Sequence, residues 1–412
     1  MNALETADII GLDERHVMAT YARAPVVFTR GSGSRLYDAD GREYLDFLCG
    51  LAVTSLGHAH PAVAEALADQ ARQLLHVSNL FHNDVQPRLA QRLDALLAGA
   101  TGQHGRCFFA NSGAEANEAA IKLARRIGQR AGGPGRYEIV SAMRSFHGRT
   151  LTTLAATGQP EKQEIFEPLP SGFRHVPFGD PHALAGAVDD RVCAVILEVV
   201  QAEGGMNMAP SGYLAAVREL CDDRGALLII DEVQTGLGRT GRWFAFEHAS
   251  VIPDIVTLAK ALGNGVPIGA CWARGDVADG FGPGDHATTF GGQPLAARAA
   301  LEVLTVLEDE DAPGRAASAG ERLTRSLCDL AAVDGVRGLG LLLAAELRPG
   351  LDAPRVVRIC LESGLVVNAL TPSAVRFTPS LLVSDDEIDE ALEIFAAALD
   401  AAAATSSPEV KS

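Results

Sequence analysis

The 412-residue chain is 47% hydrophobic and carries 35 basic and 52 acidic residues, which gives a formal net charge of −17. A chain of this length buries a large core and is expected to divide into two domains. The negative balance argues against nucleic acid or an anionic membrane as a partner. The acidic N-terminus lacks the basic start of a signal peptide, and no uncharged, glycine-free apolar run is long enough to span a bilayer. Seven well-separated cysteines without a Cys-x-x-Cys pair indicate reduced thiols in a cytoplasm.

The first regular element in chain order is a β-hairpin over residues 34–47, which turns at Asp40-Gly41. From about residue 61 to 295, apolar strands alternate with helical stretches. This alternation predicts an α/β fold with a mostly parallel sheet covered by helices. The strand candidates are residues 106–111, 138–142, 194–199, 227–231 and 268–273.

The remaining part of the chain predicts a smaller α+β domain. After about residue 296, two helical stretches flank short strands near 340–347, 365–368 and 374–378. We expect the N-terminal segment, residues 1–60, to join this small domain of residues 296–400. The large domain is predicted to span residues 61–295. The small and polar residues 401–412 are typical of a disordered tail.

Lys260 is the most informative residue of the chain. It is one of only four lysines, and it lies inside the apolar run Ile255–Leu262. Desolvation lowers the pKa of a lysine and supplies the neutral amine that Schiff-base chemistry requires. For an arbitrary lysine, a stem that lines the edge of a core is the commoner role, so the surrounding motifs have to decide.

The stretch 226–234 supplies the first of those motifs. Five apolar residues are followed abruptly by Asp231 and Glu232, as at the carboxyl end of a buried parallel strand, where ligands bind in open α/β sheets. Such an acid can hold magnesium in a nucleotide hydrolase or pair with the ring nitrogen of pyridoxal phosphate (PLP). A nucleotide hydrolase requires a phosphate-binding lysine that directly follows a glycine, and none of the four lysines follows a glycine.

The segment Gly236–Gly241 matches the Gly-x-Gly-x-x-Gly pattern of dinucleotide sites. That pattern should turn directly from a strand into a helix, whereas here it leads into Trp243-Phe244-Ala245-Phe246. The glycines therefore predict a loop with close backbone contacts rather than a nucleotide site.

A phosphate anchor is predicted at residues 112–114 instead. A short strand precedes this turn, and residues 115–126 are typical of a helix. Ser112 and Glu115 form a capping box, a common structural motif by itself. Gly113 beside the cap would let a phosphate approach the backbone N–H groups at the positive end of the helix.

These motifs together resemble the class III (ω-amino acid) aminotransferases of PLP fold type I, and within them the acetylornithine branch. The resemblance covers nearly the whole chain, from about residue 21 to 395. The stretches that carry it are 111–118, 146–150, 231–236, 288–294 and 375–379, together with the spacing from Asp231 to Lys260.

The resemblance implies a role for each cofactor-binding residue. Lys260 would form the Schiff base with PLP and move the proton, while Asp231 would pair with the pyridine nitrogen. The other implied contacts are Phe146 and Val233 on the two ring faces, Gln234 near the ring hydroxyl, Ser112, Gly113 and Ala114 at the phosphate, Glu232 beside Asp231, and Thr289 reaching the phosphate from the partner subunit of a homodimer.

The resemblance also implies the substrate contacts. Arg149 would clamp a carboxylate, Thr288 would contact the acylated substrate, and Glu203 would mask Arg376 until glutamate presents a second carboxylate. The implied reaction transfers the terminal amine of N2-acetyl-L-ornithine to 2-oxoglutarate and gives N-acetyl-L-glutamate 5-semialdehyde and L-glutamate, a step of arginine biosynthesis.

Several alternatives stay open at this stage. Phe146 could be ordinary core, Arg149 and Arg376 could be surface arginines, and His147 is expected to have a local structural role. The pair His58 and His60 lacks a partner at a ligand spacing, so no metal is expected.

The family pattern is also broken at Val199, Ala202 and Gln293, which bears on the substrate preference. The alternative functions are another ω-aminotransferase, acting on succinylornithine, N-succinyl-diaminopimelate, ornithine or 4-aminobutyrate, and a non-catalytic relative.

Overall fold

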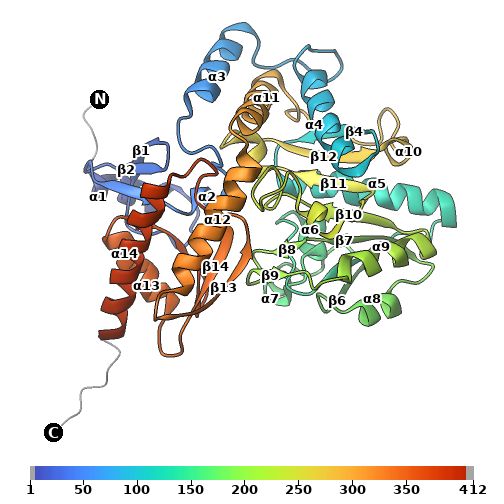
Figure 1. Cartoon of the computed structure of the whole chain (residues 1–412). Helices are drawn as coiled ribbons and strands as arrows, with labels where there is room; N and C mark the ends of the chain where they lie inside the picture. Colours follow the sequence, from blue (N-terminus) through green and yellow to red (C-terminus); the bar gives the residue numbers. More distant parts are fainter. Residues whose placement is uncertain (1–4, 405–412) are drawn as a thin grey trace.

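The computed structural model describes residues 5–404 and shows two bodies side by side, a larger one around a seven-stranded sheet and a smaller one around two four-stranded sheets (Figure 1). We call these the large sheet, the N-terminal sheet and the C-terminal sheet. The α/β fold with a mostly parallel sheet, predicted from the alternation of strands and helices, is confirmed.

The large sheet has the strand order β4-β12-β11-β10-β7-β5-β6. β12 runs antiparallel to both of its neighbours, and the other neighbouring pairs are parallel. Its strands are β4 (Gly105–Ala110), β5 (Glu138–Ala142), β6 (Phe173–Val176), β7 (Val192–Leu197), β10 (Leu227–Asp231), β11 (Ile255–Leu258) and β12 (Gly269–Arg274). All five strands predicted in this region are present, within two residues of the expected bounds, whereas β6 and β11 were not among the candidates.

Helices cover both faces of this sheet. Ile229 packs in one buried cluster with Ile121 and Ala124 of α5 (Gly113–Gly132), while Ile230 packs in the other with Val217 of α9 (Tyr213–Arg224). Because successive side chains of a strand point to opposite faces, an uninterrupted apolar strand is the expected sequence for a sheet buried on both sides.

The C-terminal part begins at α11 (Pro294–Asp309) and α12 (Ala312–Cys328). Its sheet has the antiparallel order β13-β14-β17-β16. The strands are β13 (Val333–Leu339), β14 (Leu342–Leu347), β16 (Asn368–Thr371) and β17 (Ala374–Phe377), with α13 (Ala353–Glu362) between β14 and β16.

The N-terminal sheet contains the predicted hairpin. β2 (Arg35–Asp38) and β3 (Glu43–Asp46) pair antiparallel, and Gly41 in their turn has a positive φ of 84°. β1 (Phe28–Ser32) lies on one side, and β15 (Leu365–Val366) adds to the other side parallel to β3. A strand from the C-terminal part thereby completes the N-terminal sheet.

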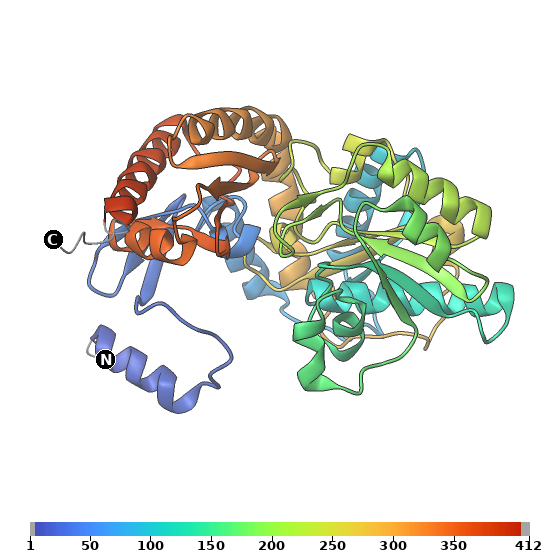
Figure 2. The same ribbon diagram turned by 90° about the horizontal axis from the view of Figure 1, so that it is seen from below.

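The two ends of the described chain are helical. α1 (Thr6–His16) buries none of its residues and stands apart from the rest of the molecule (Figure 2). α14 (Asp385–Ala404) includes residues 401–404, so this part of the predicted disordered tail is helical, and residues 405–412 lie outside the described residues. The division into domains at residues 60 and 295 stays a prediction.

The remaining elements are short or connect these layers. They are α2 (Cys49–Ala52), α3 (Pro61–Gln73), α4 (Gln86–Thr101), α6 (Leu151–Ala156), α7 (Pro160–Gln163), α8 (Pro181–Ala187), α10 (Gly275–Ala278), the 3-10 helices η1 (Glu164–Phe166), η2 (Ala245–Ala249) and η3 (Lys260–Gly263), and the strand pair β8 (Val200–Gln201) and β9 (Asn207–Met208).

Candidate functional site

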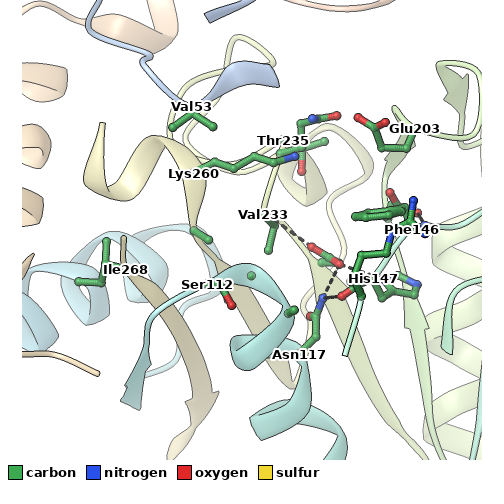
Figure 3. Close-up of a pocket in the computed structure, with 18 of the residues that line it drawn as sticks. Val53, Ser112, Asn117, Phe146, His147, Glu203, Val233, Thr235, Lys260 and Ile268 are labelled. Atoms are coloured by element: carbon green, nitrogen blue, oxygen red, sulfur yellow. Dashed lines mark hydrogen bonds and ion pairs between the residues drawn. The ribbon is translucent and has the colours of Figure 1, made fainter. Parts of the chain in front are cut away.

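A cavity of about 390 Å³ opens at the carboxyl ends of β10 and β11 and at the N-terminus of α5 (Figure 3). This is the edge at which open α/β sheets bind ligands. Most of the residues predicted for the site line it: Ser112, Gly113, Ala114, Phe146, Arg149, Glu203, Asp231, Val233, Gln234 and Lys260.

Lys260 begins η3 directly after the sheet, with a positive φ of 42°. The strained backbone turns its side chain into the cavity, where it extends toward Thr235 and Glu203 (Figure 3). Burial lowers the pKa of the Lys260 ammonium to about 8, although the negative charges of Glu203, Asp231 and Glu198 act in the opposite direction. A much larger fraction of the amine is therefore neutral near physiological pH than in a lysine of ordinary pKa.

Asp231 ends β10 and is 4% exposed. Its Oδ2 accepts from Asn117 Nδ2 and contacts His147 Nδ1, both at 2.8 Å, and its Oδ1 accepts from the Val233 N–H at 3.0 Å. Thr257 on β11 in turn donates to Asn117 Oδ1 at 2.7 Å. A carboxylate held by several donors has a fixed position and a stabilised charge.

Sequence reasoning did not identify Asn117 and Thr257 as parts of this network, and it gave His147 only a local role. A signal was present for both missed residues. Asn117 is a polar side chain on the buried face of α5, and Thr257 interrupts the apolar run of β11. Buried polar side chains are informative because they have to find hydrogen-bond partners.

The N-terminus of α5 forms a cradle at one end of the cavity. The Ser112 hydroxyl accepts from the Glu115 N–H at 3.2 Å, which confirms the cap, while the Glu115 carboxylate accepts from the Asn111 N–H at 2.6 Å. A Cβ at Gly113 would lie 2.7 Å from Val233 Cγ1, so only glycine lets the backbone approach this closely.

Phe146 and Val233 lie on opposite sides of the cavity (Figure 3). The guanidinium carbon of Arg149 lies 5.7 Å from the centre of the Phe146 ring. Arg149 is exposed at the mouth of the cavity, where its fork of donors is free to meet a carboxylate.

Arg376 lies on β17 of the C-terminal sheet and is 2% exposed. Its Nη1 donates to Glu203 Oε1 at 2.5 Å, and its Nε donates to Asn368 Oδ1 at 2.9 Å. The structure therefore brings together the two residues that the resemblance pairs, and it adds Asn368, which sequence reasoning missed.

Glu198 is a further carboxylate in the cavity wall, without a role in the sequence analysis. It accepts from the Phe146 N–H at 3.0 Å. Burial, reinforced by the negative charge of Asp231, raises its pKa well above the ordinary value of a glutamate. The sequence pattern that could have identified Glu198 is the same as for Asp231, since Glu198 directly follows the buried strand β7.

Four predicted residues do not line this cavity; one of them, Arg376, reaches its wall through the ion pair with Glu203. Glu232 is turned away, because its carboxylate accepts from the Phe246 N–H at 3.0 Å and from the Thr235 hydroxyl. Thr288 and Thr289 line a different cavity of about 820 Å³, together with His76 and Phe108. The two cavities are neighbours, because Thr288 Oγ1 accepts from Nδ2 of Asn111, a residue that lines the Lys260 cavity, at 3.3 Å.

The lining residues match the groups of PLP. The cradle offers backbone donors for a phosphate, Asp231 an anion for the pyridine nitrogen, and Lys260 an amine for the aldehyde. Gln234 Oε1 is buried without a hydrogen-bond partner in the described structure, and it suits the ring hydroxyl. Among residues 5–404, no group of three His, Cys, Asp or Glu side chains is arranged to hold a metal ion.

This combination of lysine, carboxylate and helix N-terminus defines a PLP-dependent enzyme. The sequence matches the Aminotransferase class-III family over residues 17–399, and the chain belongs to that family. It is an aminotransferase, its cofactor is PLP, and the resemblance seen in the sequence motifs is confirmed.

Individual relatives match over nearly their full length. Acetylornithine aminotransferase of Caldanaerobacter subterraneus subsp. tengcongensis is 47% identical over 392 residues, 94% of this chain and 98% of that protein. Succinylornithine transaminase/acetylornithine aminotransferase of Pseudomonas aeruginosa is 46% identical over 93% of this chain and 94% of its own length. The ornithine aminotransferase of Toxoplasma gondii, solved with partial occupancy of PLP at its active site, has a TM-score of 0.92 at 36% identity and covers 98% of this chain and 96% of its own.

None of the helices within residues 5–404 combines the length and the hydropathy that a membrane span requires. The seven cysteines all lie in this part and form no disulfide.

Proposed function

We propose that the enzyme transfers the terminal amino group of N2-acetyl-L-ornithine to 2-oxoglutarate and gives N-acetyl-L-glutamate 5-semialdehyde and L-glutamate, as a step of arginine biosynthesis. The observation that carries this proposal is the ion pair between Arg376 and Glu203 beside Lys260. The 47% identity to the acetylornithine aminotransferase of Caldanaerobacter subterraneus subsp. tengcongensis supports the same substrate. This pair suits an enzyme that handles substrates with one and with two free carboxylates in turn.

The catalytic roles follow from the site. When bound, PLP supplies an electron sink that stabilises negative charge on the substrate carbon. Lys260 Nζ, with its lowered pKa, would hold PLP through the aldehyde carbon when no substrate is bound. Once the substrate amine has replaced it at that carbon, the freed amine would take the proton from the substrate carbon and return it on the cofactor side. Asp231, positioned by Asn117 and His147, would pair with the ring nitrogen and keep it protonated.

The substrate roles use the charged residues around the cavity. Arg149 clamps the α-carboxylate of acetylornithine, and Glu203 neutralises Arg376 while this donor is bound. 2-Oxoglutarate brings a second carboxylate, which Arg376 receives after Glu203 releases it. Phe146 and Val233 would hold the two faces of the cofactor ring, and Gln234 would meet its hydroxyl.

We further propose a homodimer with shared active sites. Thr288 and Thr289 line a second cavity and not the one that holds Lys260, which supports a contribution in trans: Thr289 to the phosphate and Thr288 to the acylated substrate of the other subunit. We also propose that the enzyme acts in the cytoplasm, in line with its composition.

Other donors remain candidates because relatives carry other activities. The Pseudomonas aeruginosa relative is a succinylornithine transaminase as well as an acetylornithine aminotransferase, so succinylornithine is the second candidate donor. N-succinyl-diaminopimelate, ornithine and 4-aminobutyrate are less favoured. A non-catalytic relative is disfavoured by the lowered pKa of Lys260 beside Asp231.

A substrate panel scored by kcat/KM tests the proposal. Ornithine would bring an unacylated α-ammonium without a partner into the pocket, which should cost on the order of a hundredfold in kcat/KM against acetylornithine. An equal or better kcat/KM with ornithine or 4-aminobutyrate would remove the acetylornithine assignment and leave the aminotransferase class intact.

A further inference from the structure

The glycine-rich loop Gly236–Gly241 is not explained by the cofactor site. Gly238 and Gly241 have positive φ angles of 95° and 90°. A Cβ at Gly241 would lie 3.1 Å from Ala317 of α12, and a Cβ at Gly340 would lie 2.6 Å from the Thr240 carbonyl carbon. The loop follows β10 of the large sheet. Its glycines therefore let its backbone pack directly against the C-terminal part.

Arg239 lies at the centre of this contact and is 1% exposed. Its Nη1 donates to the carbonyl oxygens of Leu341 at 3.1 Å and Pro379 at 2.5 Å, and its Nη2 donates to Ser55 Oγ at 3.0 Å. Its own carbonyl accepts from the Leu341 N–H at 3.0 Å. One guanidinium therefore joins three segments that are far apart in the sequence.

The acceptors of this guanidinium are neutral oxygens. Burial lowers the pKa of Arg239 to about 10, so the group keeps its charge at neutral pH. Burying a charge costs several kcal/mol even after relaxation, and neutral acceptors offset only part of this cost. An arginine in this place contributes less to stability than to holding a particular arrangement, a use of buried charge that is known in some proteins.

Three of the four segments that meet at Arg239 lead into the active site; the segment of Leu341 is the exception. The loop itself follows Gln234, and the segment of Ser55 follows Val53, and both of these residues line the cavity. Pro379 comes just after β17, the strand that carries Arg376. Ser55 also contacts the segment of Pro379 directly, because its carbonyl accepts from the Leu381 N–H at 2.7 Å and from Ser380 Oγ at 3.1 Å.

We propose that Arg239 is a positioning residue that holds β17, and with it Arg376, at the distance from Lys260 that the two-carboxylate substrate requires. The inference rests on the proposed function, in which Arg376 receives the second carboxylate of 2-oxoglutarate. Without Arg239, the carbonyls of Leu341 and Pro379 lose their donor and β17 can shift. A misplacement of about 1 Å is enough to cost on the order of a hundredfold in rate.

The test compares Arg239→Met with Arg136→Met. Arg136 is a matched control because it also donates to three carbonyl oxygens, those of Val192, Arg224 and Gly225, but within the large-sheet body alone. Each half-reaction is followed separately by the absorbance of the cofactor. In Arg239→Met, we expect the apparent affinity for 2-oxoglutarate to fall about tenfold or more, with a change of less than about threefold for acetylornithine. Arg136→Met should change both half-reactions equally or not at all.

Arg239→Lys serves as the conservative variant and as the substitute if Arg239→Met does not fold. A lysine keeps the charge but cannot reach three acceptors in a fixed geometry, so an intermediate loss of 2-oxoglutarate affinity is expected. Equal losses in both half-reactions of the Arg239 variants, or no loss in either, would overturn the inference.

Hydrogen exchange provides a second readout that does not depend on the role of Arg376. Peptides over residues 374–381 should exchange faster in Arg239→Met than in Arg136→Met, and unchanged exchange would overturn the inference. Arg376→Lys separates the two proposals: if it leaves the 2-oxoglutarate half-reaction unchanged, the proposed role of Arg376 fails, and the exchange comparison then decides the inference about Arg239.

Discussion

The guanidinium of Arg376 lies 2.5 Å from the carboxylate of Glu203, although the two residues come from different bodies of the molecule. Burial by itself would raise the pKa of Glu203, but the charge of Arg376 and its hydrogen bond keep that pKa below the ordinary value. Glu203 is therefore ionised at neutral pH, and its carboxylate occupies the guanidinium of Arg376 in this structure.

The first prediction concerns this ion pair. Glu203→Gln keeps an oxygen acceptor but removes the charge, so Arg376 becomes available to any substrate carboxylate. The ratio of kcat/KM for acetylornithine to that for glutamate should fall about tenfold, in line with about 1.5–3 kcal/mol for a hydrogen bond to a charged group. Glu346→Gln is the matched control. Glu346 pairs with Arg337 at 2.6 Å on the C-terminal sheet, which also carries Arg376, and it does not line the cavity. An unchanged ratio in Glu203→Gln would contradict the switch.

Lys260→Ala should abolish turnover while the protein still folds and binds some PLP noncovalently. The covalent attachment and the proton transfer both require the amine, and no other lysine lines the cavity in the described residues. Lys122→Ala, at an exposed position, is the control and should keep its activity. Steady-state transamination by a clean Lys260→Ala sample would sink the assignment.

Asp231→Asn should reduce activity far more than PLP affinity, since the lost interaction is the charge opposite the ring nitrogen. A well-placed electrostatic contact of this kind is worth roughly 3 kcal/mol, or about a hundredfold in rate. Paired measurements of kcat and of the PLP dissociation constant separate the two effects. A loss of only a few fold in kcat would refute the role of Asp231.

The lowered pKa of Lys260 predicts how PLP attachment to the cofactor-free protein depends on pH. Below about 8 the amine is mostly protonated and not nucleophilic, so the attachment rate should rise with pH and level off above about 8. A lysine of ordinary pKa, about 10.4, would give a rate that continues to rise beyond pH 9. Stopped-flow absorbance after mixing apoenzyme with PLP distinguishes the two profiles.

Thr289→Val tests the shared active site. Losing a hydrogen bond to the phosphate should weaken PLP binding about tenfold or more, since a hydrogen bond to a charged group is worth about 1.5–3 kcal/mol. Mixed dimers of Thr289→Val and Lys260→Ala subunits should recover one site of normal affinity and activity, because each intact site takes one residue from each chain. If Thr289 acted within its own chain, mixing would recover nothing. A fully active monomer in sedimentation would contradict the dimer itself.

Local patterns were sufficient for the parts of the site that depend on neighbours in the sequence. The N-cap at Ser112 and the acid that follows the apolar run of β10 are both present in the structure at the expected positions, although Glu115 accepts from the Asn111 N–H instead of completing the capping box at Ser112. Most strands with long apolar runs were predicted for the same reason, but β11 was missed although Ile255–Leu258 is mostly apolar, and β6 was missed because Arg174 and His175 interrupt its apolar pattern. A strand at the edge of a sheet needs fewer apolar residues, so its pattern is weaker.

The sequence by itself determined the chemistry of this protein: a desolvated lysine, an acid at the end of a buried strand, and a helix N-terminus beside glycine. Only the tertiary structure decided which side chains surround these groups. Asn117 meets Asp231 across 114 positions of sequence, and Arg239 meets Pro379 across 140. Such contacts depend on the order of strands in the sheet and on how the two bodies pack, and no local period in the sequence encodes that order.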